Sequence, residues 1–521
     1  MRTTPNTHAI IKTLFFLSCL ILIVISISHS FTRNIGIYDE GFALTNAWRI
    51  MSGEIPHVDY WAAYPPGTSL TLAAFFYLFE PSLIIARFVN LGWTTLLLSS
   101  FYLTLRHFTH YWKSLLGTVL ASLWVSSSLY PSYSAIPALA IIFFVLFIYF
   151  KAIKSETNSL LYLAGSVAGI SVIFRHDFTA YLFISCLFAL TLLHFTHSHT
   201  GQDRLIIRKT ATFLTVFLIT SLISLFLLLM ISGWHNFYEQ AIKFPATGMR
   251  DHRLLPVPGF LEFPHHLKKW LLAWTAPILC VFTSSYLYIF RNKTTLIIKT
   301  ALLILLCMSF FLTFQAHSRL DMTHAVPSML FSILLLATLS SSISEHELKV
   351  IKLIDVTLLT SLILITLFLC LDRIKTKNSY NCAVNLTENS CARAHPLQEE
   401  VVDYIWDNHS NSNYIFVGNT YHDKIFINDA SLYFLLKKPI PVMWNEMHPG
   451  IVTTSEVQKE IIDQLNKKEV NIIVLSQMPT PQENNKSSMS SKIHILDRFI
   501  AKNFHVIAKN TRYSILKRTV D

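Results

Sequence analysis

The chain contains 521 residues, of which 52% are hydrophobic and only 14% are charged. That charged fraction is about half the value typical of soluble globular proteins, and such a protein could not bury so much apolar surface. The formal net charge of +11 comes from Lys and Arg residues scattered among the loops between apolar runs. They form no single basic stripe, so we expect no nucleic-acid partner.

Long apolar runs recur along the chain and define its fold class. They are long enough to cross a hydrocarbon core of about 30 Å as helices, and they lack the two-residue alternation of barrel strands. We therefore predict an α-helical polytopic membrane protein. The eleven expected transmembrane helices are residues 9–30, 83–105, 112–130, 135–150, 158–174, 178–197, 210–232, 270–290, 296–314, 325–342 and 353–371.

Two apolar segments near the N-terminus need separate interpretation. The first run resembles a secretory signal because Arg2 and Lys12 lie beside or within it, but its length and the lack of a small-residue cleavage site favour a retained helix. The stretch Thr68–Phe79 follows Pro65, Pro66 and Gly67 and has about 12 residues. That is too short to cross a bilayer comfortably, so we predict an interfacial or re-entrant helix.

The distribution of Lys and Arg gives the spans a direction. With the N-terminus in the cytoplasm, every predicted inner connection is basic, whereas the short outer connections carry one basic residue or none. The basic residues of the inner connections are Arg106, Lys113, Lys151, Lys154, Arg204, Arg208, Lys209, Arg291, Lys293, Lys299, Lys349 and Lys352. Eleven spans then place the C-terminus outside the cytoplasm.

The chain is expected to have two domains. Residues 1–372 form the transmembrane domain, with long outer loops at 31–82 and 233–269, and residues 373–521 form a small extracytoplasmic α/β domain. Its expected strands are Tyr414–Val417, Asn471–Leu475 and Tyr513–Leu516, and its expected helix is Thr454–Asn466. Cys382 and Cys391 precede this domain and are close enough in sequence to form a disulfide in an oxidising compartment.

The sharpest local motif is Tyr38-Asp39-Glu40-Gly41, directly after the first span on the predicted outer side. Two adjacent carboxylates repel, which raises the proton affinity of one and suits it to act as a base near neutral pH. The alternative is an ordinary helix start, because acidic side chains favour a helix N-terminus. Asp39 and Glu40 are the candidate catalytic residues.

The same outer loop holds a second group of candidates. His57, Asp59 and Tyr64 lie just before the Pro-Pro-Gly turn, where they could contact substrate, although the two prolines themselves point to architecture. His57 and Asp59 could also bind a metal ion, but two ligands without clear partners are weak evidence for a metal site. We therefore expect no certain cofactor, with a divalent metal ion possible but not favoured.

Ionisable residues also gather at the outer ends of later spans. Arg319 could pair with a phosphate, and His324 lies about one helical turn beyond Arg319 and Asp321. An internal ion pair that pins helices together is the alternative. For Arg175 with Asp177 this alternative stands equal to a functional role, whereas for Arg319 the functional role is favoured. Further candidates are Arg87, four residues into its span, and Arg250 of the basic outer loop, which also contains Lys243, His252 and Arg253. Attraction to lipid headgroups is an equally simple account of this loop.

The order of these features resembles the GT-C glycosyltransferases, in particular the branch of protein O-mannosyltransferases and the lipid A aminoarabinose transferase. The resemblance rests on an outer Asp39-Glu40 pair after the first span, a Pro-Pro-Gly interfacial helix, an Ala86-Arg87 step into the second span and a C-terminal outer domain. It covers roughly residues 9–371 and is strongest over 36–90.

The resemblance implies an inverting glycosyltransferase in a bacterial inner membrane. Its donor is expected to be a polyprenyl-phosphate sugar, and its acceptor an envelope glycan, lipid or protein outside the cytoplasm. Asp39 matches the acidic residue that acts as base or orients the acceptor hydroxyl, and Glu40 matches its neighbour. The alternatives are a transporter or flippase for a lipid-linked or anionic solute and a membrane-anchored binding protein. A transporter would place its ionisable residues near mid-membrane in repeated halves, and the sequence has no visible repeat.

Overall fold

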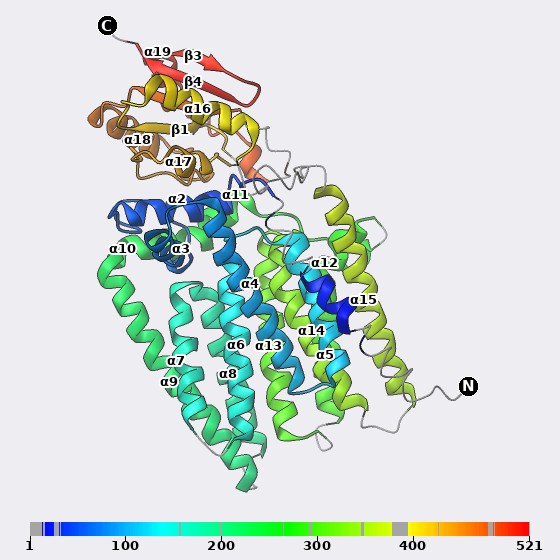
Figure 1. The fold of residues 1–521 in the computed structure, drawn as a ribbon. Helices are drawn as coiled ribbons and strands as arrows, with labels where there is room; N and C mark the ends of the chain where they lie inside the picture. Colours follow the sequence, from blue (N-terminus) through cyan, green and yellow to red (C-terminus); the bar gives the residue numbers. More distant parts are fainter. Residues whose placement is uncertain are drawn as a thin grey trace.

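The computed structural model describes residues 13, 16–24, 31, 33–155, 158–197, 201–263, 265–290, 294–344, 349–377, 394–425, 427–477, 483 and 485–519. A bundle of long helices carries a smaller α/β domain at one end, with short helices between the two (Figure 1). Residues 16–24 of the expected first span are helical. Cys382 and Cys391, and with them the expected disulfide, lie outside the described residues.

Each expected span after the first coincides with a helix of the bundle. These helices are α4 (Leu83–Arg106), α5 (Tyr111–Ser128), α6 (Ala135–Lys154), α7 (Ser159–Ile170), α8 (His176–His197), α9 (Gly201–Ser232), α12 (Leu267–Ile289), α13 (Leu296–Ser318), α14 (Met322–Ser344) and α15 (Lys349–Lys377). The chain is therefore a multi-pass integral membrane protein. Within the described residues, eight helices are long and apolar enough to cross a membrane.

The expected count of eleven is not confirmed, for identifiable reasons. Helix α7 has only 12 residues and continues as a 3₁₀ turn, Ser171–Ile173, so its straight α-helical part rises only about 18 Å. Helix α5 has 18 residues and is rich in serine, and it is not among the eight. The three expected spans that are not among these eight helices are α5, α7 and the partly described N-terminal run.

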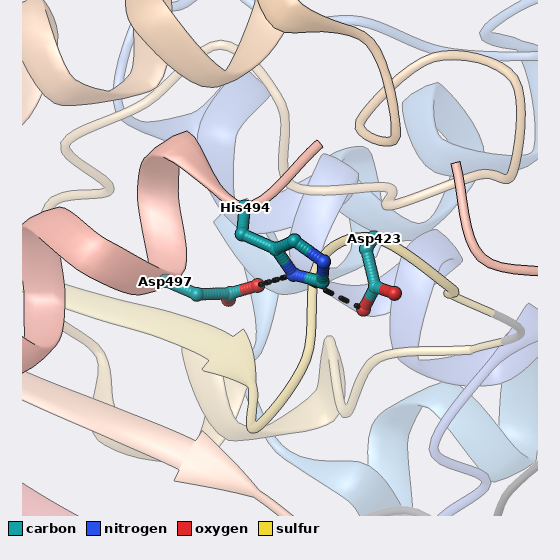
Figure 2. A group of neighbouring side chains, drawn as sticks. All are labelled: Asp423, His494 and Asp497. Atoms are coloured by element: carbon teal, nitrogen blue, oxygen red, sulfur yellow. Dashed lines mark ion pairs between the residues drawn. The ribbon is translucent and has the colours of Figure 1, made fainter. Parts of the chain in front are cut away.

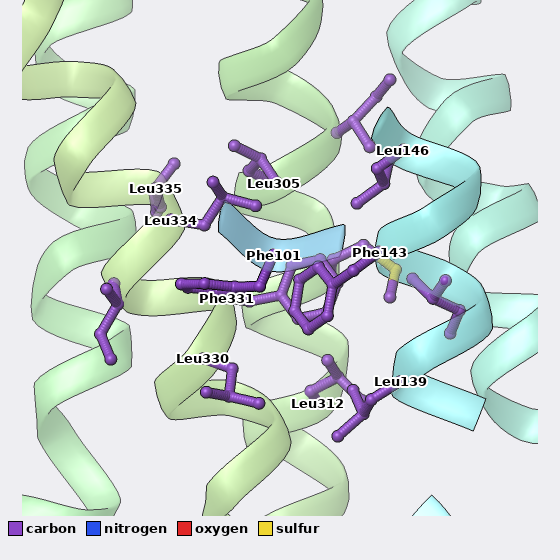
Figure 3. Close-up of a cluster of buried hydrophobic side chains, with 14 of the residues drawn as sticks. Phe101, Leu139, Phe143, Leu146, Leu305, Leu312, Leu330, Phe331, Leu334 and Leu335 are labelled. Carbon is purple, nitrogen blue, oxygen red and sulfur yellow. The ribbon is translucent and has the colours of Figure 1, made fainter. Parts of the chain in front are cut away.

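Two helices form the centre of the bundle, and two lie at its edge. Of the apolar windows, 94% of that in α14 and 83% of that in α6 is buried inside the protein, against 17% in α9 and 28% in α15. Figure 3 shows the central packing: the Phe143 ring of α6 stacks on Phe331 of α14, and Phe101 of α4 meets Phe143 edge-on, each pair with centroids 5.0 Å apart. The sparsely buried faces of α9 and α15 are left for lipid.

The layer at the top of the bundle consists of short helices. They are α2 (Asp39–Met51), α3 (Gly67–Leu78), α10 (Trp234–Phe237), the π-helical turns η3 (Tyr238–Lys243) and η4 (Pro245–Met249), and α11 (Arg250–Arg253). The expected short apolar helix is confirmed as α3. The basic outer loop is instead a helical segment over most of residues 234–253, with π-helical turns of the kind often found at functional sites.

The C-terminal domain contains a four-stranded sheet of order β1-β2-β4-β3. Strand β1 (Ile415–Asn419) runs parallel to β2 (Ile472–Ser476), whereas β4 (Tyr513–Arg518) is antiparallel to both β2 and β3 (Phe504–Lys509). The helices of this domain are α16 (Pro396–His409), α17 (Ser431–Leu436), α18 (Ser455–Lys467), α19 (Ile495–Asn503) and the 3₁₀ turn η7 (Lys486–Ser488). The three expected strands and the expected helix are confirmed.

The C-terminal domain rests on α2. The Thr45 hydroxyl donates to the carbonyl of Ala430 at 2.7 Å, and the Asn46 amide donates to Glu446 at 2.8 Å. Gly41 allows close approach, because a Cβ there would lie 2.8 Å from the backbone nitrogen of Ser431. Helix α2 is therefore fixed from above by the α/β domain.

Candidate active site

A cleft of about 510 Å³, open solvent at its mouth included, lies in the layer between the bundle and the C-terminal domain. Its walls come from α2, the loop that leads into α3, the loop before α6 and one residue of the C-terminal domain. The lining residues are Asp39, Phe42, Ala43, Asn46, Pro56, Tyr60, Ala62, Tyr64, Pro65, Pro66, Thr68, Ser69, Ser132, Tyr133, Ser134 and Glu446. The turn Tyr64-Pro65-Pro66 therefore forms a wall of the cleft as well as starting α3.

Asp39 supplies a half-buried carboxyl to this cleft at the first residue of α2. Burial raises its pKa to about 6, even though the positive charges near it, led by His324 and Arg253, act in the opposite direction. Asp321 adds to the rise, and Arg319 opposes it. Asp39 is thus within electrostatic reach of the whole Arg319-Asp321-His324 group, which comes from more than 270 residues later in the chain.

Glu40 has different surroundings, although it is the next residue. It is 1% exposed, forms an ion pair with Arg87 at 3.1 Å and accepts a hydrogen bond from the Gly36 backbone nitrogen at 2.7 Å. Arg87 also donates to the carbonyl oxygens of Arg33 and Asn34. Successive side chains on a helix point about 100° apart, so one carboxylate faces the cleft and the other fastens α2 to α4. Neither Glu40 nor Arg87 lines the cleft.

Arg319, Asp321 and His324 form a connected group between α13 and the start of α14. Asp321 accepts hydrogen bonds from the His324 ring at 2.8 Å and backbone at 2.9 Å, and its other oxygen lies 3.3 Å from Arg319. Burial opposes ionisation, but His324 and Arg319 hold the pKa of Asp321 well below its usual range. Arg319 also forms a two-pronged ion pair with Glu483 of the C-terminal domain, at 3.0 and 2.6 Å.

In the basic outer segment, Arg253 rather than the predicted Arg250 lies close enough to affect the pKa of Asp39. Arg250 is exposed, whereas Arg253 is buried and stacks over the Tyr38 ring at 5.2 Å, donating also to its hydroxyl. Tyr38 in turn contacts the His448 ring nitrogen at 3.2 Å. The sequence predicted a basic outer loop from Lys243, Arg250, His252 and Arg253, but which of these residues approaches the cleft depends on how α11 packs.

Tyr64 is linked to the second predicted arginine group. The Arg175 guanidinium lies 4.8 Å from the centre of the Tyr64 ring and pairs with Asp177 through bonds of 2.9 and 2.6 Å. Gln315 of α13 donates to Asp177 at 2.6 Å. This group braces the wall of the cleft from below. Tyr133, which the sequence did not single out, lines the cleft beside it.

His57 and Asp59 do not line the cleft, although Pro56 and Tyr60 beside them in the chain do. His57 is fully buried with φ +67° and contacts Gln240 of η3 at 3.1 Å, while the Gln240 amide donates to the His57 carbonyl at 3.0 Å. Asp59 is exposed and accepts from the Ile55 backbone nitrogen at 2.7 Å. They stabilise the outer loop and are not gathered with a third ligand. In the described part of the chain, the potential metal-ligand group is Asp423, His494 and Asp497 of the C-terminal domain.

This arrangement combines one carboxyl whose pKa lies near neutrality with several cations around the same cleft. Such a carboxyl can take a proton from a hydroxyl, and the guanidinium groups can stabilise an anion that leaves on the other side. The cleft lies at one end of the helical bundle, where residues of α2 and of the C-terminal domain line it together.

Comparison with known proteins identifies the fold. No family model matches the chain, and no curated protein matches its sequence. Among solved structures, it is similar to ArnT from Cupriavidus metallidurans bound to undecaprenyl phosphate, with 12% identity over 98% of both chains and a TM-score of 0.57. The apo state of ArnT gives a TM-score of 0.56 at the same identity and coverage.

A second neighbour is the archaeal oligosaccharyltransferase AglB from Archaeoglobus fulgidus, in complex with an inhibitory peptide and a dolichol-phosphate. It is 10% identical over 89% of this chain and 69% of its own length, with a TM-score of 0.52. ArnT and AglB are both GT-C glycosyltransferases. At these identities the similarity concerns the fold, and the chain therefore has the GT-C fold that its sequence predicted.

Proposed function

We propose that this protein is an inverting glycosyltransferase that moves a sugar from a polyprenyl-phosphate donor to an extracytoplasmic acceptor. The observation that carries the proposal is Asp39: a half-buried carboxyl with a pKa of about 6, lining a cleft and surrounded by Arg253, Arg319 and His324. The GT-C fold supports the same reading, because the two neighbours are described with bound undecaprenyl phosphate and dolichol-phosphate.

The proposed reaction is a single displacement. Asp39 accepts the proton of the acceptor hydroxyl, the acceptor oxygen attacks the anomeric carbon, and the bond from that carbon to the phosphate oxygen breaks. The polyprenyl phosphate leaves with the electron pair, and the nearby Arg253 and Arg319 stabilise its charge. Tyr64 and Tyr133, in the wall of the cleft, would contact the sugar.

The number of carboxylates that are free to react at the cleft supports inversion of the anomeric centre. A retaining mechanism requires a second carboxylate as nucleophile about 5 Å from the first. Glu40 is committed to Arg87, and both oxygens of Asp321 are engaged by His324 and Arg319. Glu446, the other carboxyl that lines the cleft, is engaged by Asn46 and His448. Among the described residues of the cleft, Asp39 is therefore the carboxyl that remains available, and inversion needs no nucleophilic carboxylate.

We assign residues 1–372 to the catalytic transmembrane domain and residues 373–521 to a domain that completes the outer side of the cleft. The charge pattern supports a cytoplasmic N-terminus and an extracytoplasmic cleft in a bacterial inner membrane. Glu446, which lines the cleft, and Glu483, which contacts Arg319, both come from the C-terminal domain. The acceptor, whether envelope glycan, lipid or protein, would therefore meet both domains.

The test is transfer of the sugar in cells and in membranes. Mass spectrometry of lipid-linked sugars and envelope glycans after gene deletion is expected to show an accumulated donor and an unmodified acceptor, both restored by the wild-type gene. Asp39→Asn, correctly inserted, is expected to lower restoration at least 100-fold. Asp251→Asn removes an exposed carboxylate of α11 and serves as the matched control. Full restoration by Asp39→Asn would overturn the proposed role of Asp39, and unchanged lipid and glycan profiles after deletion would overturn the transferase.

A further inference from the structure

A second cluster of chemically active side chains lies in the C-terminal domain, outside the cleft. It joins the loop after β1, which carries Asp423, to the first turn of α19, which carries His494 and Asp497. In Figure 2 the His494 ring lies between the two carboxylates. One ligand atom from each residue lies within 4.8 Å of the others.

Asp423 is the unusual member of this cluster. It is only 4% exposed, and its Oδ1 accepts no hydrogen bond from any of the described residues. A buried carboxylate oxygen without a donor is costly, because it has lost its water and gained nothing in return. This oxygen points toward the His494 ring, whose nitrogen is 3.9 Å away and therefore too distant for a hydrogen bond.

The distances fit a shared ion better than direct contacts. The His494 Nδ1 lies 3.6 Å from Asp497 Oδ2 and 3.9 Å from Asp423 Oδ1. Ligand atoms held at about 2.1 Å from a tetrahedral zinc ion are separated by about 3.4 Å. All three ligand atoms lie within 4.8 Å of one another, so side-chain rotations that draw them together would reach that geometry. Two carboxylates and one neutral imidazole also balance the two positive charges of the ion.

The position of the Asp497 carboxylate is fixed by hydrogen bonds from His422. The buried His422 ring donates from Nδ1 to Asp497 Oδ1 at 2.8 Å, and its other nitrogen accepts from the Asn419 backbone at 3.3 Å, which fixes the tautomer. The His422 backbone nitrogen also donates to both oxygens of Asp497, at 3.2 and 3.3 Å, and Oδ2 is the oxygen directed at His494. The Gln458 amide donates to the carbonyl of His422 and to that of Ile493, so the backbone on both sides of the cluster is fixed. Metal ligands are commonly oriented by such partners.

We propose that Asp423, His494 and Asp497 bind a divalent transition-metal ion, with zinc as the best fit. The mixed oxygen and nitrogen donor set favours zinc over magnesium or calcium, which prefer oxygen ligands alone. The ion would connect the loop after β1 to the start of α19. The Ser491 backbone nitrogen already connects the same two segments, because it donates to the Asp423 carbonyl at 2.8 Å. The role of the ion is structural: it fixes one end of the segment that precedes α19 and carries Glu483.

Metal content of the full-length protein in detergent tests the site directly. The protein is stripped with a chelator, dialysed against zinc at micromolar concentration, and analysed by inductively coupled plasma mass spectrometry. One zinc per chain is expected, with at least tenfold weaker zinc binding in Asp423→Asn and in His494→Ala. His505→Ala removes an exposed histidine of β3 in the same domain and is expected to keep the full zinc content.

Thermal unfolding gives a second readout, because an ion that binds only the folded state raises the unfolding temperature. Zinc is expected to raise it for the wild type and for His505→Ala but not for His494→Ala, whose half-exposed side chain can be lost without damage to the core. Three results would overturn the proposal: no bound zinc in the wild type, a zinc content in Asp423→Asn and His494→Ala equal to that of the wild type, or stabilisation by magnesium equal to that by zinc. In the first case the cluster is a His-Asp ion pair.

Discussion

The interior of the helical bundle and the layer beneath the C-terminal domain are built by opposite means. At the centre of the bundle, α6 and α14 meet through stacked rings and leucines (Figure 3). Buried hydroxyl groups of α14, such as those of Ser332 and Thr338, donate hydrogen bonds within their own helix. In the layer that holds the cleft, charged pairs make contacts between segments: the buried pair of Glu40 with Arg87 and the partly exposed pair of Arg319 with Glu483.

The difference follows from the two solvents. Lipid is as apolar as leucine, so helices in the bundle associate through close packing, and a charge there would be expensive. The layer at the end of the bundle tolerates charged side chains provided that each is paired. A buried ion pair nevertheless adds little to the free energy of unfolding compared with apolar packing. Charges that contribute so little to stability are expected to serve positioning or chemistry. Substitutions in the two regions can test whether apolar packing provides the stability and the charged pairs provide the positioning and chemistry.

The largest effect is expected where a buried pair is broken without replacement. Glu40→Gln leaves the Arg87 guanidinium buried with its carbonyl partners only, and we expect a loss of about 3–5 kcal/mol in the free energy of unfolding. The double variant Glu40→Gln/Arg87→Met removes both charges and is expected to recover most of it. Thermal unfolding of the detergent-solubilised protein measures both.

Arg106→Met is the matched control, because Arg106 lies at the other end of α4 and is exposed. It is expected to change the unfolding temperature little. For comparison, Phe143→Ala, in the middle of the bundle, is expected to cost about 3–5 kcal/mol through the cavity that it leaves. If Glu40→Gln is as stable as the wild type but inactive, Glu40 belongs to the chemistry and the contrast between the regions fails at this residue.

The helical fold was predictable because each apolar run carries its own boundary signals. Helices α4, α13 and α14 begin within a few residues of the expected positions, and Thr454 caps α18 as its sequence indicates. Strand β3 was missed because it is an edge strand with exposed residues such as His505, which gives no apolar alternation. The turns η3 and η4 were missed because π-helical geometry has no sequence pattern of its own.

The candidate site was predictable only in part, because its residues meet through tertiary contacts. The sequence placed Asp39, Arg319, Asp321 and His324 on the same side of the membrane, and the structure gathers them. It could not distinguish Asp39 from Glu40, because the difference is set by Arg87, 47 residues away in α4. Nor could it select Arg253 over Arg250, since that depends on Tyr38, the residue before α2.

The next-largest expected effect is the pH dependence of the sugar-transfer rate, which the ionisation of Asp39 would set. If Asp39 is the base, transfer requires its ionised form, so the rate is expected to fall about tenfold for each pH unit below its pKa of about 6. Above pH 7 the rate is expected to be independent of this group. Initial rates of sugar transfer between pH 4.5 and 8 in detergent measure it.

The same pKa predicts a change in stability. Because the folded-state pKa of Asp39 is raised, its ionisation costs stability as the pH rises from about 4 to above 6. Asp39→Asn removes that cost and is expected to raise the unfolding temperature by a few degrees at pH 7.5, but not at pH 4. Asp251→Asn, on the protein surface, is expected to do neither. A rate that stays constant down to pH 4.5 contradicts the assignment of Asp39 as the base.

A smaller effect separates the two arginines of α11. Arg253→Ala removes a guanidinium that stacks on Tyr38 and lies close to Asp39, and we expect about a tenfold loss in binding of undecaprenyl phosphate. Arg250→Ala removes an exposed charge and is expected to change binding less than twofold at physiological salt. Binding to protein in nanodiscs of neutral lipid measures both. Equal losses would mean that the segment attracts anionic lipid by net charge rather than by a specific contact.

The smallest effect concerns the contact of Glu483 with Arg319. Both side chains are partly exposed, at 25% and 15%, so their ion pair contributes at most about 1 kcal/mol. If Arg319 binds the donor phosphate, Glu483 competes with it, and Glu483→Gln is expected to tighten undecaprenyl phosphate binding up to about fivefold. Glu456→Gln, an exposed change on α18, is expected to have no effect. Weaker binding in Glu483→Gln would show that Glu483 holds Arg319 in its binding position instead, so that the C-terminal domain completes the site rather than covering it.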